Sequence, residues 1–120
     1  MPFKFEKLLV WQKAVDLSDE VNRIVKSFPK EEMYILTSQI KRATDSISLN
    51  IAEGSTGQSS AEFTRFLNMA LRSNVEVVAC IHLAKRRDII NLTDFHNIYC
   101  RCEEIIVMIN GLKKSLVQKN

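Results

Sequence analysis

The sequence has few of the residues that interrupt helices. It contains 3 glycines and 2 prolines among 120 residues, while hydrophobic residues make up 46%. A disordered chain would show the opposite balance, with little apolar surface to bury and many helix breakers. We therefore expect a single folded domain over residues 1–120, large enough to enclose a core.

Long apolar runs are missing as well. None approaches the roughly 20 residues that a membrane-spanning helix needs, and the N-terminal residues lack the basic start and apolar centre of a secretory signal. The cysteines, Cys80, Cys100 and Cys102, are odd in number and lie within helical patterns. This usage predicts reduced thiols in a cytoplasmic protein that does not contact membranes.

Four stretches of the chain carry apolar residues at alternating steps of four and three. Such spacing places each set on one face of a helix. It predicts helices over about 8–27, 31–53, 60–87 and 93–116, and hence an all-α fold, an antiparallel up-down-up-down four-helix bundle. We expect Gly54 to end the second helix in the left-handed conformation, and the Ser59 hydroxyl to cap the third.

Catalytic and metal-binding patterns are not found in the sequence. Neither His82 nor His96 follows a glutamate by three residues, which is the spacing that di-iron bundles use. The cysteines match no usual zinc spacing, and the Gly54–Gly57 stretch lacks the lysine of a phosphate-binding loop. We therefore expect a protein that is not an enzyme, with no catalytic residue, metal or cofactor.

Basic residues occur in groups, although the formal net charge is only +3. An excess of this size permits nucleic-acid binding without requiring it, and solvated helix ends are the ordinary explanation of such groups. Seven residues are the candidates for contact with nucleic acid or with a partner: Lys41, Arg42, Arg65, Arg72, Lys85, Arg86 and Arg87.

Polar residues run beside the apolar stripe of the second expected helix. In an antiparallel hairpin Arg42 then falls near Ser73 and Glu76 of the third helix. Two interpretations stay open, a structural layer that fixes the register of the helices and a site for a ligand or partner. Carboxylates without a substrate pocket define no reaction, so they do not support an enzyme. The polar layer consists of Arg42, Ser46, Asn50, Glu53, Ser73 and Glu76.

The third and fourth helices carry more apolar residues than the core of one bundle needs. A helix that is apolar on every side is normally buried on every side, which predicts a homo-oligomer in which each chain covers its neighbours. The N-terminal aromatic residues either reach a neighbour or fold back over their own bundle. The expected interface residues are Phe3, Phe5, Val75, Val78, Tyr99, Ile106 and Met108.

Several motifs resemble one known family. They are Val10-Trp11-Gln12-Lys13-Ala14, the stretch from Leu36 to Ala43, Asn50-Ile51-Ala52-Glu53-Gly54, and Glu62-Phe63 with the residues that follow to Glu76. Together they resemble the four-helix-bundle proteins encoded in intervening sequences of bacterial 23S ribosomal RNA genes, also called the S23 family. The resemblance covers about residues 5–84. The chain departs from the family at Ser48, where proline is common, and at Arg72, where glycine is.

The resemblance extends the expectations for function. A related branch of the family is the accessory protein of diversity-generating retroelements, a pentamer of bundles that binds a reverse transcriptase and nucleic acid. The resemblance therefore implies a homopentamer with an RNA-linked role, and it supplies no reaction. We expect a bacterial protein that binds RNA, DNA or a nucleoprotein partner. The alternative is a structural or protein-interaction module whose basic residues only keep the assembly in solution.

Overall fold

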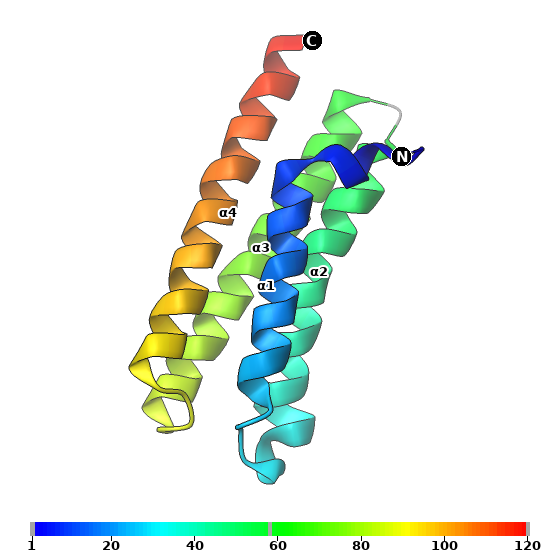
Figure 1. Ribbon diagram of the computed structural model, residues 1–120. Helices are drawn as coiled ribbons and strands as arrows, with labels where there is room; N and C mark the ends of the chain where they lie inside the picture. The colour runs from blue at the N-terminus through cyan, green and yellow to red at the C-terminus, as the bar shows by residue number, and fades with distance from the viewer. Residues whose placement is uncertain (1, 58, 120) are drawn as a thin grey trace.

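The structure, a computed structural model, describes residues 2–57 and 59–119, with the side chains of 118 and 119 excepted. Figure 1 shows four long helices side by side, each running opposite to the one before it, and this confirms the predicted all-α bundle. The helices are α1 (Leu9–Val25), α2 (Ser38–Ser55), α3 (Ser60–Arg86) and α4 (Leu92–Lys119). Three short turns complete the fold: η1 (Lys4–Lys7), η2 (Lys30–Glu32) and η3 (Met33–Thr37).

The core consists of the apolar stripes that the spacing predicted. Each helix contributes residues that are 0% exposed, for example Leu17, Ile47, Leu67 and Ile105. Removing aliphatic side chains from water is the main source of stability in a bundle of this kind. Across the described residues, no helix combines the length and the apolar character that crossing a membrane requires.

The beginning of the second helix differs from the prediction. A helix was expected from residue 31, but a 3-10 turn over Lys30–Glu32 and a π-helical turn over Met33–Thr37 precede α2. A π-turn holds one more residue than an α-turn. Within this segment Leu36 lies in the core at 1% exposure, while Tyr34 and Ile35 lie outside it, 89% and 60% exposed. Apolar spacing does not reveal such an insertion.

Gly54 does not have the predicted left-handed conformation. It lies inside α2, and among the described residues no glycine has a positive φ. Its importance lies in the close approach of two helices: a Cβ at this position would lie 2.6 Å from Phe66 Cβ and 2.9 Å from Phe63 Cδ1. The glycine therefore lets the end of α2 rest against the start of α3.

The beginning of α3 matches the sequence. The Ser59 hydroxyl accepts a hydrogen bond from the Glu62 backbone N–H at 3.1 Å, as predicted for an N-cap. The Glu62 carboxylate pairs with Arg65 instead of reaching back to Ser59. At the other end of the bundle the Asn91 side chain accepts from the Asp94 N–H at 2.7 Å, just before α4.

The N-terminal arm folds back over its own bundle. The rings of Phe5 and Trp11 meet edge to face with centroids 4.8 Å apart. Phe3 lies beyond them and is 60% exposed. Of the two arrangements that the sequence left open, the structure has the one within the chain for Phe5, while Phe3 keeps an uncovered ring.

Candidate functional site

The basic candidate residues divide into two groups. Lys41, Arg42, Arg72 and Arg86 have exposed side chains. Arg72 lines a shallow hollow on α3 together with Arg65, Asn68 and Met69. The Lys85 ammonium lies 4.9 Å from the centroid of the Phe95 ring, a cation–π contact that leaves its charge uncancelled.

Arg65 and Arg87 are instead paired with carboxylates. Arg65 Nη2 lies 2.8 Å from Glu62 Oε1, and its hydrogen bond lowers the pKa of Glu62. Arg87 Nη1 lies 3.0 Å from Glu32 Oε1, which ties the end of α3 to the turn before α2. Both pairings reduce the positive charge that these two arginines offer to a ligand.

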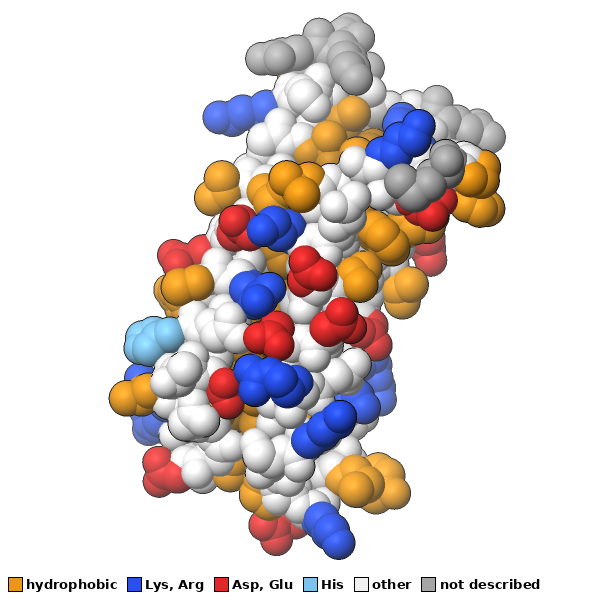
Figure 2. Space-filling view, in the orientation of Figure 1, with side chains coloured by type: hydrophobic (Ala, Val, Ile, Leu, Met, Phe, Trp, Pro, Cys, Tyr) orange, Lys and Arg blue, Asp and Glu red, His pale blue; other side chains and the backbone are white. Residues whose placement is uncertain are grey.

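The seam between α1 and α4 is held by ion pairs. Lys13 pairs with Glu104 at 3.3 Å, Arg23 with Asp94 at 3.3 Å, and Arg101 with Glu20 at 3.8 Å. Hydrogen bonds from Arg23 and then from Asn97 lower the pKa of Glu20. Figure 2 views the molecule over these helices and shows acidic and basic side chains interspersed. This face therefore presents a mixed charge and not a basic surface.

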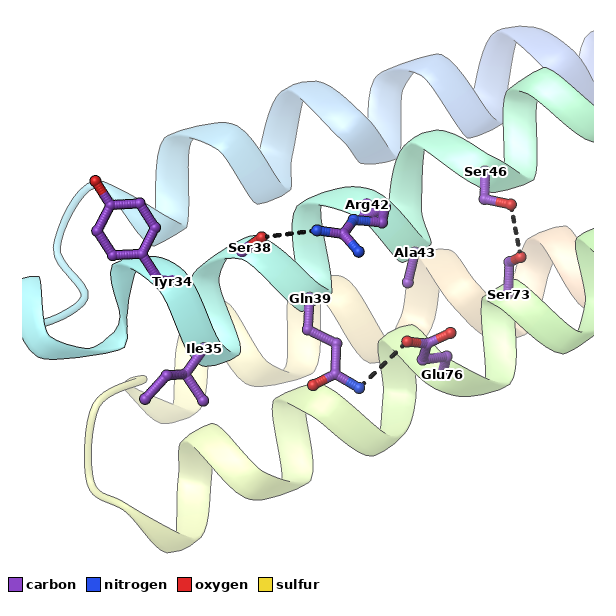
Figure 3. A pocket seen from close by; sticks show the side chains of 9 residues that line it. All are labelled: Tyr34, Ile35, Ser38, Gln39, Arg42, Ala43, Ser46, Ser73 and Glu76. Atoms are coloured by element: carbon purple, nitrogen blue, oxygen red, sulfur yellow. Dashed lines mark hydrogen bonds between the residues drawn. The ribbon is translucent and has the colours of Figure 1, made fainter.

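A groove between α2 and α3 brings together several of the polar candidate residues. Its volume is about 560 Å³, within the roughly 300–1,000 Å³ of small-ligand sites. Figure 3 shows Tyr34 and Ile35 at one end and the Ser46–Ser73 pair at the other. The nine lining residues are Tyr34, Ile35, Ser38, Gln39, Arg42, Ala43, Ser46, Ser73 and Glu76.

Hydrogen bonds hold the polar side chains of the groove in place (Figure 3). Arg42 Nη2 donates to the Ser38 hydroxyl at 3.3 Å. Gln39 Nε2 donates to Glu76 Oε2 at 3.3 Å, which links α2 to α3. The Ser73 hydroxyl donates to that of Ser46 at 2.9 Å. The arginine and the carboxylate are thus oriented before any ligand arrives.

The structure brings part of the predicted polar layer together. Arg42, Ser73 and Glu76 share the groove, as the hairpin geometry predicted. Asn50 lies one turn beyond, where its Nδ2 donates to the Ser46 backbone carbonyl at 2.8 Å. Glu53 does not line the groove. The set is not a buried layer, because the side chains of Arg42, Glu53 and Glu76 are exposed.

Among the described residues, two polar side chains are 0% exposed, those of Thr44 on α2 and Asn74 on α3. Thr44 bonds the Ile40 carbonyl of its own helix, whereas Asn74 Nδ2 donates to the Cys102 carbonyl of α4 at 3.3 Å. Its Oδ1 has no hydrogen-bond partner among the described residues. A buried amide that bonds one point on a facing helix favours a single register. That structural role therefore belongs to Asn74 and not to the exposed polar stripe.

Sequence reasoning missed the residues at the end of the groove. Tyr34, Ile35 and Ser38 were not among the candidates. The available signal was that Tyr34 and Ile35 are large apolar residues just before Leu36, and both lie off the apolar stripe. Both lie on the π-turn and have exposed side chains.

Two of the cysteines are core residues. Cys80 and Cys102 are 1% and 0% exposed, and burial raises the pKa of Cys80 to about 11 and that of Cys102 to about 12. Cys100 is exposed. In the part of the chain that the structure describes, no group of three or more His, Cys, Asp or Glu side chains is placed to hold a metal ion.

The predicted interface residues differ in their exposure. Val75 is 60% exposed, whereas Val78, Tyr99 and Met108 are half-buried against the chain's own core. Ile106 is half-buried too. Part of the apolar surplus on α3 and α4 is thus covered within the chain. The side chains that remain uncovered on these helices include Leu83 and Val107, 44% and 71% exposed.

These features define a class of protein, an antiparallel four-helix bundle with one polar groove between its second and third helices. Comparison with protein families then places it: the chain belongs to the 23S rRNA-intervening sequence protein family, whose model matches residues 6–111. The resemblance that the motifs predicted is confirmed, and the match extends into the fourth helix. The link to the retroelement accessory protein stays a prediction.

A solved structure has a similar fold. It is a crystal structure of a protein with unknown function from the S23 ribosomal protein family of Bacteroides thetaiotaomicron. The two chains share 25% sequence identity with a TM-score of 0.82, over 88% of this chain and 99% of the other. None of the curated proteins compared with the chain matches it.

Proposed function

We propose that this protein is a non-enzymatic, oligomeric helical bundle of the bacterial cytoplasm that binds nucleic acid or a nucleoprotein partner. The observation that carries the proposal is a set of basic side chains without carboxylate partners. Among the described residues, the ion pairs involve none of the following: Lys41, Arg42, Arg72, Lys85 and Arg86.

Basic side chains that no carboxylate neutralises attract the phosphates of a nucleic-acid backbone. A lysine or arginine that neutralises a phosphate releases a counterion from the nucleic acid, and this release drives binding at low salt. The arginines of the α1–α4 seam already form ion pairs with carboxylates, so they should attract phosphate less strongly. The family's name, which connects its members with 23S ribosomal RNA genes, supports RNA as the first nucleic acid to test.

The salt dependence of RNA binding tests this function. We expect the protein to bind a structured RNA at low salt and to weaken steeply towards physiological salt, with a log–log slope of about one per phosphate contact. Arg72→Gln should lower the slope by about one unit, because Arg72 forms no ion pair with a carboxylate of the described residues. Arg65→Gln is the matched control on the same helix and should change it less, because Glu62 already holds Arg65.

Two results would contradict these expectations for RNA binding. Absence of binding at low salt would overturn the proposal and favour the protein-interaction alternative. Equal effects of the two substitutions would contradict the importance that we assign to unpaired charge. Fluorescence anisotropy with a labelled RNA hairpin measures both quantities.

We also propose that the functional unit is a closed ring of copies, a pentamer by the family resemblance. Uncovered aliphatic side chains on α3 and α4 support an interface there, since burying each fully is worth about 1.5–3 kcal/mol. A cyclic arrangement lets one chain use two different faces against two neighbours. Val75 is the interface residue of α3 with the most exposed side chain.

Light scattering of two lysine variants tests the ring. The unmodified protein should have a mass near five times the 13.8 kDa of one chain, and Val75→Lys should shift it to the mass of a monomer. Leu49→Lys on α2 is the control, because Leu49 is also 60% exposed but lies outside the proposed interface. A mass near 13.8 kDa for the unmodified protein would refute the interface, as would equal effects of the two substitutions.

A further inference from the structure

Three chemically different groups line the groove between α2 and α3. An aromatic ring, Tyr34, marks one end; a guanidinium, Arg42, lies on α2; and a carboxylate, Glu76, lies on α3 (Figure 3). Hydroxyl and amide groups separate them. A ligand that follows the groove must present a flat apolar face at one end, and a negative charge and hydrogen-bond donors farther along.

Tyr34 is suited to stacking. Its side chain is 89% exposed on the π-turn, and among the described residues no other aromatic ring packs on it. An uncovered ring of this kind offers a face to a planar ligand, and stacking on aromatic side chains is the usual way in which proteins hold unpaired bases. π-turns are rare and are frequently found at functional sites.

Arg42 is suited to an anion. The Ser38 hydroxyl accepts from one of its terminal nitrogens, and within the described part of the chain the other N–H groups of the guanidinium have no hydrogen-bond partner. No ion pair is formed by Arg42 within the described residues, although Glu76 lines the same groove. The planar guanidinium matches phosphate oxygens in a two-point contact.

Glu76 restricts which base is accepted. Gln39 donates to its Oε2, which orients the carboxylate, while no side chain of the described residues donates to its Oε1. A carboxylate accepts hydrogen bonds and donates none, so it favours a base edge that presents an amino group. Cytosine carries a donor amino group at the position where uracil has an acceptor carbonyl.

We propose that the α2–α3 groove binds a short unpaired stretch of a nucleic-acid strand. Tyr34 stacks on one base at the end of the groove, Arg42 holds a phosphate, and Glu76 accepts a hydrogen bond from the amino edge of another base farther along. This inference rests on the proposed nucleic-acid function and names the part of the ligand that the groove takes. A paired base is excluded, because its face is covered by its neighbours and its edge is engaged by its partner.

The test compares short labelled oligo(C) and oligo(U) strands and an RNA duplex, by fluorescence anisotropy at low salt with the full-length protein. We expect oligo(C) to bind more tightly than oligo(U), and both more tightly than the duplex. Tyr34→Ala should weaken binding of the single strands about tenfold, in line with the measured cost of losing one stacked base. Tyr34→Phe keeps the ring and should bind as the unmodified protein does.

Glu76→Gln tests the selectivity. A glutamine side chain presents both a donor and an acceptor, so the ratio of the affinities for oligo(C) and oligo(U) should fall to about one. Glu53→Gln is the matched control, because it makes the same change of charge on an exposed residue outside the groove. That substitution should tighten the binding of both strands slightly and leave their ratio unchanged.

The outcomes separate the two proposals. If structured RNA binds with the expected salt dependence but Tyr34→Ala has no effect, the groove is not the site and the broader function stands. Equal ratios for Glu76→Gln and Glu53→Gln would overturn the role of the carboxylate. If neither RNA nor single strands bind at low salt, both proposals fail. Circular dichroism of each variant shows whether the bundle is still folded.

Discussion

Asn74→Asp is expected to destabilise the bundle strongly at neutral pH and very little in acid. The substitution keeps the shape of the side chain, and a protonated carboxyl can donate to the Cys102 carbonyl as the amide does. An ionised carboxylate at this site would be 0% exposed and would face a carbonyl oxygen. An unpaired buried charge of this kind costs about 3–5 kcal/mol.

The direction of the pH dependence follows from burial. Desolvation raises the pKa of the introduced carboxyl in the folded state above the value of about 3.9 that it has in the unfolded chain. Below that pH both states are protonated and ionisation costs nothing. Between the unfolded-state pKa and the folded-state pKa, the unfolded chain loses its proton first, so the free energy of unfolding falls as the pH rises. Above the folded-state pKa both states are ionised, and the free energy of unfolding falls no further.

Urea unfolding of the variant at pH 4 and pH 7, each compared with the unmodified protein at the same pH, measures this difference. Asn68→Asp provides the control, because Asn68 lies on the same helix with an exposed side chain, and it should cost less than about 0.5 kcal/mol. An equal loss at the two pH values for Asn74→Asp would show that the site admits water or relaxes around the charge.

Gly54→Ala should be destabilising, although alanine is normally the better helix residue. The added methyl group would lie 2.6 Å from Phe66 Cβ, an atom fixed to the backbone of α3. The two helices must separate to admit it, and overpacking of this kind costs about 1–3 kcal/mol. Thermal unfolding at one fixed protein concentration measures the loss, because association of copies makes stability depend on concentration.

Gly111→Ala is the matched comparison and should have the opposite sign. Among the described residues, no atom lies within 4 Å of a Cβ at this position on α4, so helix propensity decides the effect, and alanine is favoured by up to about 1 kcal/mol. If both substitutions stabilise the protein, α2 and α3 do not approach each other as closely as the structure has them.

The helices could be predicted from the sequence because burial and periodicity act along the chain. The apolar stripes of the four helices contain Leu17, Ile47, Leu67 and Ile105, and each of these residues lies in the core. The π-turn before α2 could not be predicted, because one extra residue in a turn leaves no mark on composition. The role of Gly54 was misread for a related reason: its requirement comes from Phe66 on another helix.

The site was predicted less completely, since it depends on which side chains meet across helices. The hairpin geometry correctly placed Arg42 near Ser73 and Glu76. The pairing of Arg65 with Glu62 is local, three residues apart, and could have been read from spacing. The pairing of Arg87 with Glu32 joins residues 55 positions apart and could not have been predicted from spacing. The exposure of Tyr34 could have been inferred from its place off the apolar stripe, but the π-turn that carries it could not.

The short connection between α2 and α3 has a consequence for folding kinetics. Helices that follow each other in the chain also lie side by side, and α2 and α3 pack together most extensively. Bringing them together closes a loop of few residues, which costs little chain entropy, and topologies rich in such local contacts fold within microseconds to milliseconds. We expect this hairpin to form among the first parts of the bundle. The groove would then exist in each newly folded chain, before that chain meets another copy.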